Sequence, residues 1–208
     1  MNDQLKQAII DGNEAVALAM TQALLATGAT PRAILDEALL PGMEVVGARM
    51  REGECFIPEV LLSARVMQAC LDLLRPHMAA GEEAGMGTVV IGTVEGDLHD
   101  IGKNLVGMLL SGAGFEVVNL GTGVTSAAFA AAVKEHAPKI VGMSALLTTT
   151  LPHMAETIAL LKAEGLREAV KVMVGGAPVT AAYAAEIGAD GYGANAGMAV
   201  ERAKELVG

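Results

Sequence analysis

The sequence predicts an α/β protein in which an N-terminal helical bundle precedes a doubly wound, five-stranded parallel sheet of flavodoxin-like strand order. Three observations support this fold class. Apolar residues recur at three- and four-residue spacing from Asp3 to His77, which is typical of helices. From Thr88 onward, short β-branched runs alternate with helical patterns, as in parallel sheets with right-handed crossovers. A small, polar, glycine-rich stretch from Ala79 to Gly87 separates the two regions. We therefore predict a helical domain at residues 1–80, a linker at 81–87 and a sheet domain at 88–208.

Local start and stop signals define the expected helices of the bundle. One helix runs from about residue 13 to 26, and Thr30 caps the next, with Pro31 at its first position, where the missing N–H of proline costs no hydrogen bond. Pro41 and Gly42 are expected to end this helix, so that a separate one covers residues 43–51. The last helix begins near Pro58 and places these apolar residues along one side: Leu61, Ala64, Met67, Leu71 and Leu74.

The second half reads as five strand–helix units. TVVIGTV, residues 88–94, is continuously apolar and β-branched, as expected of a strand buried on both faces. Further strands are predicted at 115–120, 140–145, 170–174 and 190–192, and helices at 103–114, 126–136, 152–164, 180–187 and 197–207. In such folds, ligands bind beyond the carboxyl ends of the strands, where the strand order reverses.

Composition excludes several classes of protein. Apolar residues make up 52% of the 208 residues, enough for a core, but no run reaches the roughly 18–20 residues that span a bilayer. A net charge of −10 with thinly spread Lys and Arg argues against a nucleic-acid partner. The start, MNDQLKQAII, resembles no signal peptide, so a cytoplasmic protein without a membrane partner is expected. Cys55 and Cys70 match no CxxC pattern, and we expect both to be buried, reduced thiols.

The stretch EGDLHDIGKN, residues 95–104, follows the first predicted strand and carries a histidine between two aspartates. Asp97 and His99 are two residues apart, so in an extended loop the carboxylate can accept the imidazole N–H. This contact fixes the tautomer and makes the other ring nitrogen a better metal ligand. In the alternative interpretation, Asp97 or Asp100 caps the following helix and His99 is simply exposed. Spacing alone favours that alternative.

Glycines and hydroxyls follow the other strands at the same expected edge of the sheet. Gly96 and Gly102 flank the loop, and Gly175 with Gly176 ends the fourth strand; such glycines permit close approach by a large ligand. Ordinary βα turns explain them equally well. Hydroxyls cluster after the third strand, either for a ligand or for capping the next helix: Ser144, Thr148, Thr149 and Thr150.

The residues that other functions of this fold require are missing from this sequence. A receiver domain needs an aspartate at the end of the third strand, where Ser144 stands. A flavodoxin needs aromatic residues around its flavin, whereas the chain has no Trp and two Tyr. A GxGxxG dinucleotide motif after the first strand and a nucleophile elbow are also absent from the sequence.

Three separated motifs, Asp97-Leu98-His99-Asp100-Ile101-Gly102, Ser144-Ala145-Leu146 and Gly175-Gly176, resemble the DxHxxG, SxL and GG signature of cobalamin-binding domains. PGMEVVGARMREGECFIPEVLLSARVM, residues 41–67, is similar to the helical cap domain of methionine synthase and of the small corrinoid proteins of methyltransferase systems. The likeness covers nearly the whole chain. Its size resembles a stand-alone corrinoid protein rather than full methionine synthase.

The resemblance implies a role for each motif. His99 would be the lower axial ligand of cobalt, replacing the cofactor's own base, whose tail would insert into the Rossmann-like cobalamin-binding domain. Asp97 would hydrogen-bond His99 and, with Thr150 where methionine synthase has a serine, form a proton-linked relay. The other residues expected at the cofactor are Gly96, Leu98, Asp100, Ile101, Gly102, Ser144, Leu146, Thr148, Gly175 and Gly176, with Phe56, Ile57 and Leu61 of the cap over its upper face.

The implied function is a methyl carrier that catalyses little alone. It would accept a methyl group from a substrate-specific corrinoid methyltransferase and pass it to a second methyltransferase with a pterin or thiol acceptor. A reductive activase is a further implied partner, and the cap would move about a hinge between Ala79 and Gly87. Three alternatives stay open: a cobalamin sensor, the small subunit of a cobalamin mutase, and a Rossmann-like domain without a cofactor.

Overall fold

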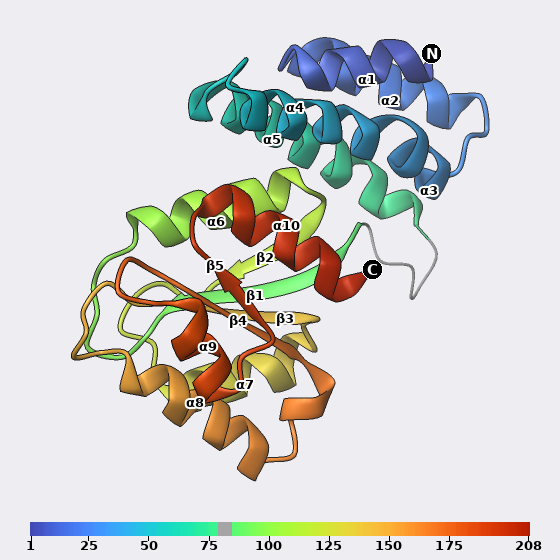
Figure 1. Ribbon diagram of the computed structural model, residues 1–208. Helices are drawn as coiled ribbons and strands as arrows, with labels where there is room; N and C mark the ends of the chain where they lie inside the picture. Colours follow the sequence, from blue (N-terminus) through green and yellow to red (C-terminus); the bar gives the residue numbers. More distant parts are fainter. Residues whose placement is uncertain (79–84) are drawn as a thin grey trace. The chain divides into compact units, whose positions relative to one another are not determined.

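The computed structural model describes residues 1–78 and 85–208, so residues 79–84 of the predicted linker region lie outside the described residues (Figure 1). Contacts divide the chain into two compact units. The helical unit consists of Met1–Met86 and Met108–Glu116, and the sheet unit consists of Gly87–Gly107 and Val117–Gly208. No helix among the described residues is long and apolar enough to cross a membrane.

The helical unit is built mainly from α1 (Asn2–Ile10), α2 (Glu14–Ala26), α3 (Pro31–Ile34), α4 (Leu40–Glu52) and α5 (Ile57–Leu74). The predicted cap is confirmed, since the Thr30 hydroxyl accepts the Ala33 N–H before α3. Asn13 caps α2 in the same way by accepting the Val16 N–H. Its core contains fully buried side chains from α1, α2, α5 and the segment Leu35–Leu39, among them Leu5, Ile9, Ala17, Leu39, Met67 and Leu74.

The expectation that Pro41 ends a helix is wrong. Leu35–Leu39 forms a π-helical turn between α3 and α4, and the proline lies in the first turn of α4. The Leu40 N–H bonds to the Leu35 carbonyl, five residues back. This wider turn carries the chain past a residue that has no N–H to donate. The continuous helical segment ends only at Gly53, which has the left-handed φ of 74° common at helix ends.

Both cysteines are buried and free, as predicted. Burial raises the pKa of the Cys55 thiol and of the Cys70 thiol above the ordinary value. Since the thiolate is the reactive form, neither side chain is activated as a nucleophile.

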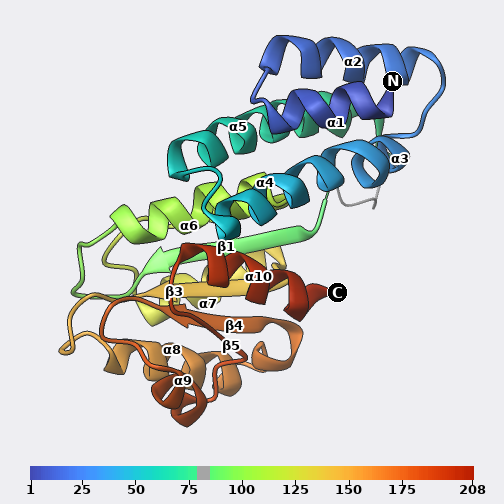
Figure 2. The ribbon, with the colours of Figure 1, turned by 45° about the horizontal axis from the view of Figure 1, so that its top comes forward.

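The sheet unit has the predicted strand order, β2-β1-β3-β4-β5 (Figures 1 and 2). The strands are β1 (Gly87–Thr93), β2 (Phe115–Asn119), β3 (Ile140–Ser144), β4 (Lys171–Gly175) and β5 (Gly191–Gly193). β1 is almost entirely buried, as its unbroken apolar run predicts. Phe115 and Glu116, at the start of β2, group with the helical unit by contacts.

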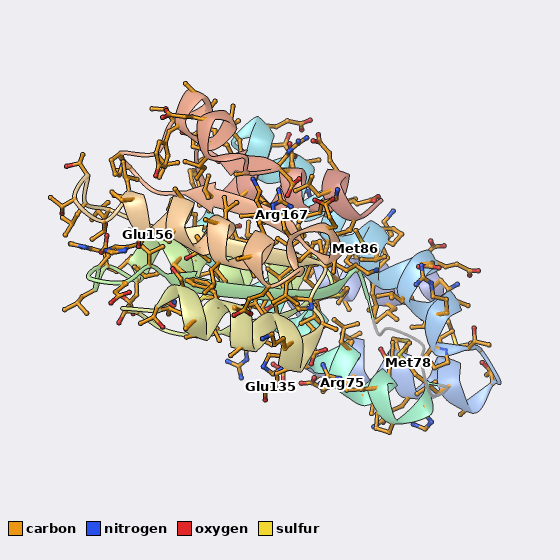
Figure 3. The ribbon with its side chains drawn as sticks, turned by 90° about the horizontal axis from the view of Figure 1, so that it is seen from below. Arg75, Met78, Met86, Glu135, Glu156 and Arg167 are labelled. Atoms are coloured by element: carbon orange, nitrogen blue, oxygen red, sulfur yellow. The ribbon has the colours of Figure 1, made fainter. Side chains whose placement is uncertain are left out.

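Helices cover both faces of the sheet. α7 (Ser126–His136), α8 (Pro152–Ala163) and α9 (Ala181–Ile187) lie on one face, and α6 (Ile101–Gly112) and α10 (Ala196–Val207) on the other (Figures 1 and 2). Figure 3 views the unit from the side of α7 and α8, which carry the exposed Glu135 and Glu156. Their inner sides bury Phe129, Val133, Met154 and Ile158 against the strands.

The register of the strands brings three loops together. Thr93 pairs with Ser144, and Ser144 pairs with Gly175, so β1, β3 and β4 end at one level. The loops that follow these strands therefore begin side by side at the carboxyl edge of the sheet, beside the point where the strand order reverses.

Gly176, at the start of the loop after β4, cannot carry a side chain. Its φ is 126°, and a Cβ would overlap the backbone oxygen of Ala145. We expect Gly176→Ala to lower the free energy of unfolding by roughly 2–4 kcal/mol, because it combines backbone strain with a backbone clash. Urea unfolding measures the loss.

Gly165→Ala is the matched control. Gly165 also has a positive φ, 71°, but no other described atom outside its immediate neighbours lies within 4 Å of its Cβ position. Its replacement should cost only about 1 kcal/mol, the strain of the backbone alone. Equal losses for the two variants would contradict the clash with Ala145.

Candidate functional site

The centre of the site is the fully buried carboxylate of Asp97, in the loop after β1. Gly96 turns the chain there with a φ of 77°. The backbone of Asp97 is held on both sides, since its N–H donates to the Val94 carbonyl at 3.2 Å and its carbonyl accepts the Gly123 N–H at 3.0 Å. The side chain consequently enters the edge of the sheet from a fixed position.

Five donors surround this carboxylate. Oδ1 lies 3.0 Å from the His99 backbone nitrogen and 2.7 Å from Nδ1 of its ring. Oδ2 accepts the N–H groups of Leu146 at 2.7 Å and Leu147 at 3.2 Å, and lies 3.0 Å from the Thr150 hydroxyl. The loop after β1 and the loop after β3 are thus joined through one side chain.

These donors determine the charge of Asp97. Burial alone would raise the pKa of its carboxyl group. Four hydrogen bonds together outweigh the effect of burial and hold the pKa well below its ordinary value of 3.8. They come from the Leu146 amide, the His99 amide, the His99 ring and the Leu147 amide. Asp97 is therefore ionised at neutral pH, although its side chain is shielded from water.

The ionised carboxylate fixes the tautomer of His99. A carboxylate can only accept, so Nδ1 must carry the proton, and in the neutral ring the lone pair is on Nε2. None of the hydrogen bonds within residues 1–78 and 85–208 uses Nε2. The side chain is 52% exposed. The predicted contact with Asp97 is present, and the ring offers one nitrogen to a ligand outside the protein.

Thr150 adds a hydroxyl at Oδ2 of Asp97, at the position where the sequence analysis placed it. Its single proton has a second acceptor, the Leu147 carbonyl at 2.9 Å. The hydroxyl can donate to only one of them at a time. Rotation of this O–H adds or removes one hydrogen bond at the carboxylate without moving any heavy atom.

Exposed apolar side chains adjoin the polar pair. Leu98 and Ile101 flank His99 in the chain and are 78% and 86% exposed. Leu146 and Leu147, whose amides hold Asp97, are also exposed. Grouped, exposed side chains of this size are uncommon on a protein surface and mark sites for an apolar ligand or partner.

The other expected site residues are distributed over several elements. Ser144, Gly175 and Gly176 are at the ends of β3 and β4, although Gly176 is explained by the chain's own backbone. Thr148 is exposed in the loop after β3, and Gly102 is exposed in the first turn of α6. Three expected residues belong to the helical unit, where Phe56 is 70% exposed: Phe56, Ile57 and Leu61.

Asp100, rather than Asp97, begins α6. Its carbonyl accepts the Asn104 N–H at 2.7 Å, and its Oδ2 accepts the Asn104 side-chain amide at 2.9 Å. Asp100 thus stands immediately before α6, and its side chain contacts that of Asn104. Capping of this helix does not account for the buried Asp97.

Sequence reasoning missed the buried Lys103. Its Nζ lies 2.6 Å from Oδ1 of Asn104 and 2.7 Å from Oδ1 of Asn119, tying α6 to the end of β2. Burial lowers the pKa of Lys103, an effect that the charge of Asp100 opposes. A lysine inside a helix gives no sequence signal of such a network, because its partner Asn119 is distant in the chain.

Thr93 was also missed. Its fully buried hydroxyl donates to the His99 carbonyl at 2.9 Å. A signal for it existed in the sequence, since Thr93 is a polar residue near the end of an otherwise apolar strand.

Two family models match the chain. Both are described as a B12 binding domain, one covering residues 87–201 and the other residues 1–75. A corrinoid protein of Desulfitobacterium hafniense (strain Y51) is 43% identical over 99% of this chain and 97% of its own length. Dimethylamine corrinoid protein 1 of Methanosarcina acetivorans is 48% identical over 85% of this chain and 84% of its own length.

Solved structures resemble the whole chain. A cobalamin-binding protein from Desulfitobacterium hafniense DCB-2 has a TM-score of 0.78 at 36% identity, covering 100% of this chain and 99% of its own. A chain of the methanol:cobalamin methyltransferase complex from Methanosarcina barkeri has a TM-score of 0.85 at 33% identity, covering 98% of this chain and 78% of its own.

The hydrogen bonds at Asp97 predict that Asp97→Asn strongly destabilises the fold. A carboxylate accepts through both oxygen atoms, whereas an amide has one oxygen and one NH₂ group, so in the variant the NH₂ group would face N–H donors. We expect the free energy of unfolding at neutral pH to fall by roughly 2–3 kcal/mol. Urea unfolding measures it, with the exposed Asp36→Asn as a control that should cost at most about 0.5 kcal/mol.

The stability lost in Asp97→Asn should also depend on pH. Because the folded-state pKa of Asp97 is depressed, its stabilising contribution is present above the unfolded value of 3.8 and is lost as the pH falls through the folded pKa. The stability difference between the wild type and Asp97→Asn should therefore narrow below about pH 4. Stability curves that stay parallel down to the acid limit of folding would exclude this assignment.

Proposed function

The chain belongs to the family of proteins with B12-binding domains, and from this premise we propose that it is a corrinoid protein carrying a methyl group between two methyltransferases. The resemblance to cobalamin-binding corrinoid proteins is confirmed, and with it the corrinoid cofactor, because both halves match such domains and corrinoid proteins share 43% and 48% identity with the chain. The carrier function is favoured because these relatives include a dimethylamine corrinoid protein and a chain of a methanol:cobalamin methyltransferase complex.

The observation that carries the proposal at residue level is the Asp97–His99 pair. A corrinoid whose own base is displaced needs one nitrogen ligand from the protein, and His99 offers Nε2 with its lone pair. The macrocycle presents a broad face of ring carbon atoms, and the exposed Leu98 and Ile101 would offer it apolar contacts beside that nitrogen. These residues fit the cofactor in donor type and in polarity.

When bound, the corrinoid supplies a cobalt centre that takes a methyl group from one donor and releases it to an acceptor. The task of the chain is to hold that centre. His99 would bind it through Nε2, and Asp97 would keep the ring in the required tautomer and orientation.

The Asp97–His99 pair would also have a proton-linked role. A proton taken up when His99 releases the metal would go to Nε2, while the carboxylate 2.7 Å from Nδ1 stays ionised. The Thr150 hydroxyl can then turn towards Oδ2 or away from it. Ligand release by His99 is in this way linked to proton uptake at Nε2.

The partners follow from the carrier role. One partner is a methyltransferase that loads the methyl group from a substrate, and relatives named for dimethylamine, trimethylamine and methanol indicate small methylated compounds as that class of substrate. The other is a methyltransferase that delivers the group to a pterin or a thiol. A reductive activase would restore the cofactor after accidental oxidation.

Ligation by His99 is tested with the purified protein and hydroxocobalamin under reducing, oxygen-free conditions. After desalting, we expect near-stoichiometric corrinoid and a visible spectrum that changes in His99→Ala to that of a form lacking a lower nitrogen ligand. His153→Ala is the control, because His153 also pairs with a carboxylate, Glu156 at 2.8 Å, but on the surface of α8. Identical spectra for the wild type and His99→Ala would remove His99 from this role.

Methyl carriage is tested separately. The loaded, reduced protein should take up a methyl group from methyl iodide and keep it until a corrinoid:thiol or corrinoid:pterin methyltransferase and its acceptor are added. Loss of the group only in light, together with tighter retention of adenosylcobalamin than of methylcobalamin, would instead indicate a sensor.

A further inference from the structure

We propose that Thr93 is a positioning residue for the histidine ligand: its hydroxyl holds the peptide group of His99 so that the imidazole is set in place before the cofactor binds. This inference rests on the proposed function. It concerns a residue outside the three motifs and outside the Asp97–His99–Thr150 contacts.

Thr93 is itself firmly held. It is the last residue of β1 and is fully buried. Its N–H donates to the Gly121 carbonyl at 3.0 Å, and its carbonyl accepts the Val124 N–H at 2.9 Å. Its Cα is also paired with that of Ser144 across the sheet. The hydroxyl is therefore attached to a backbone position that hydrogen bonds hold in the sheet.

The bond from Thr93 complements those from Asp97. The His99 backbone N–H and its ring Nδ1 both meet the same atom, Oδ1 of Asp97. Because both bonds end at one atom, His99 could still rotate about that atom without breaking either of them. The bond from Thr93 to the His99 carbonyl, 2.9 Å long, lies on the other side of the Cα atom and provides a second anchor.

A second anchor matters because the ring is exposed. With 52% of the side chain open to solvent, packing alone does not fix the ring. An exposed ligand that is free to turn loses that freedom on binding the metal, and this lost entropy weakens the bond. Thr93 restricts the freedom in advance, so less of it is lost when Nε2 binds cobalt.

The test compares Thr93→Val, which keeps the shape and removes the hydroxyl, with Thr93→Ser, which keeps the hydroxyl. Each variant is loaded with cobalamin, reduced to Co(II), and examined at one neutral pH by visible absorption and electron paramagnetic resonance, in which an axial nitrogen splits the signal. We expect the ratio of His-bound to His-free cofactor to fall about three- to ten-fold in Thr93→Val, the range of one net hydrogen bond. Thr93→Ser should restore most of it.

Thr157→Val is the matched control. Thr157 is a buried threonine of the same unit whose hydroxyl also bonds a backbone carbonyl, that of His153 at 2.7 Å. Its loss should lower the thermal unfolding temperature without changing the Co(II) spectra. If Thr93→Val does not fold, Thr93→Cys takes its place, because a thiol fits the site and is only a weak donor.

The outcomes separate the two proposals. An unchanged ratio in a folded Thr93→Val or Thr93→Cys overturns the positioning role, and so does an equal change in Thr157→Val, which would trace the effect to general stability. Both results leave the spectral difference between the wild type and His99→Ala intact. Loss of that difference would instead overturn ligation by His99, on which the positioning role depends.

Discussion

The structure of the site depends on one constraint: a buried carboxylate must be fully hydrogen-bonded. A charged group removed from water is costly unless donors surround it, and Asp97 obtains them from its own loop and from the loop after β3. The register of β1 against β3 places these loops side by side, so the sheet brings the donors within reach. The carboxylate in turn fixes both loops, and the position of His99 follows from that arrangement.

The arrangement reconciles two requirements that usually conflict. A metal ligand has to be accessible, and it has to be held in one orientation. As the proposed metal ligand, His99 would meet the first requirement through its half-exposed ring and the second through bonds to buried groups of Asp97 and Thr93. The apolar side chains at its flanks make no bonds to the ring and remain exposed for a ligand. Buried groups therefore hold the imidazole in place, and exposed side chains remain available to contact a ligand.

The sequence was informative where a local pattern determines the structure. The alternating runs predicted all five strands of a flavodoxin-like sheet. The two-residue spacing of Asp97 and His99 only allowed their contact, and it was the resemblance of the DxHxxG motif to cobalamin-binding domains that predicted it. Prediction was wrong at Pro41, because a π-helical turn before a proline has no composition that distinguishes it from an ordinary helix. The partners of Thr93 and Lys103 could not be predicted, because the folded loops bring them together, although Thr93 stood out as a polar residue in an apolar strand. Position 176 requires a glycine because a Cβ there would overlap the Ala145 oxygen, whether or not a ligand is present.

Two threonine hydroxyls act on the pair in different ways. Thr150 reaches Oδ2 of Asp97, so rotation of its hydroxyl changes how well the negative charge of the carboxylate is stabilised. Thr93 contacts only the backbone of His99, so its bond changes where the ring lies without altering the charge of the pair. The charge of the carboxylate and the placement of the ring are therefore influenced by separate residues, one in the loop after β3 and one at the end of β1.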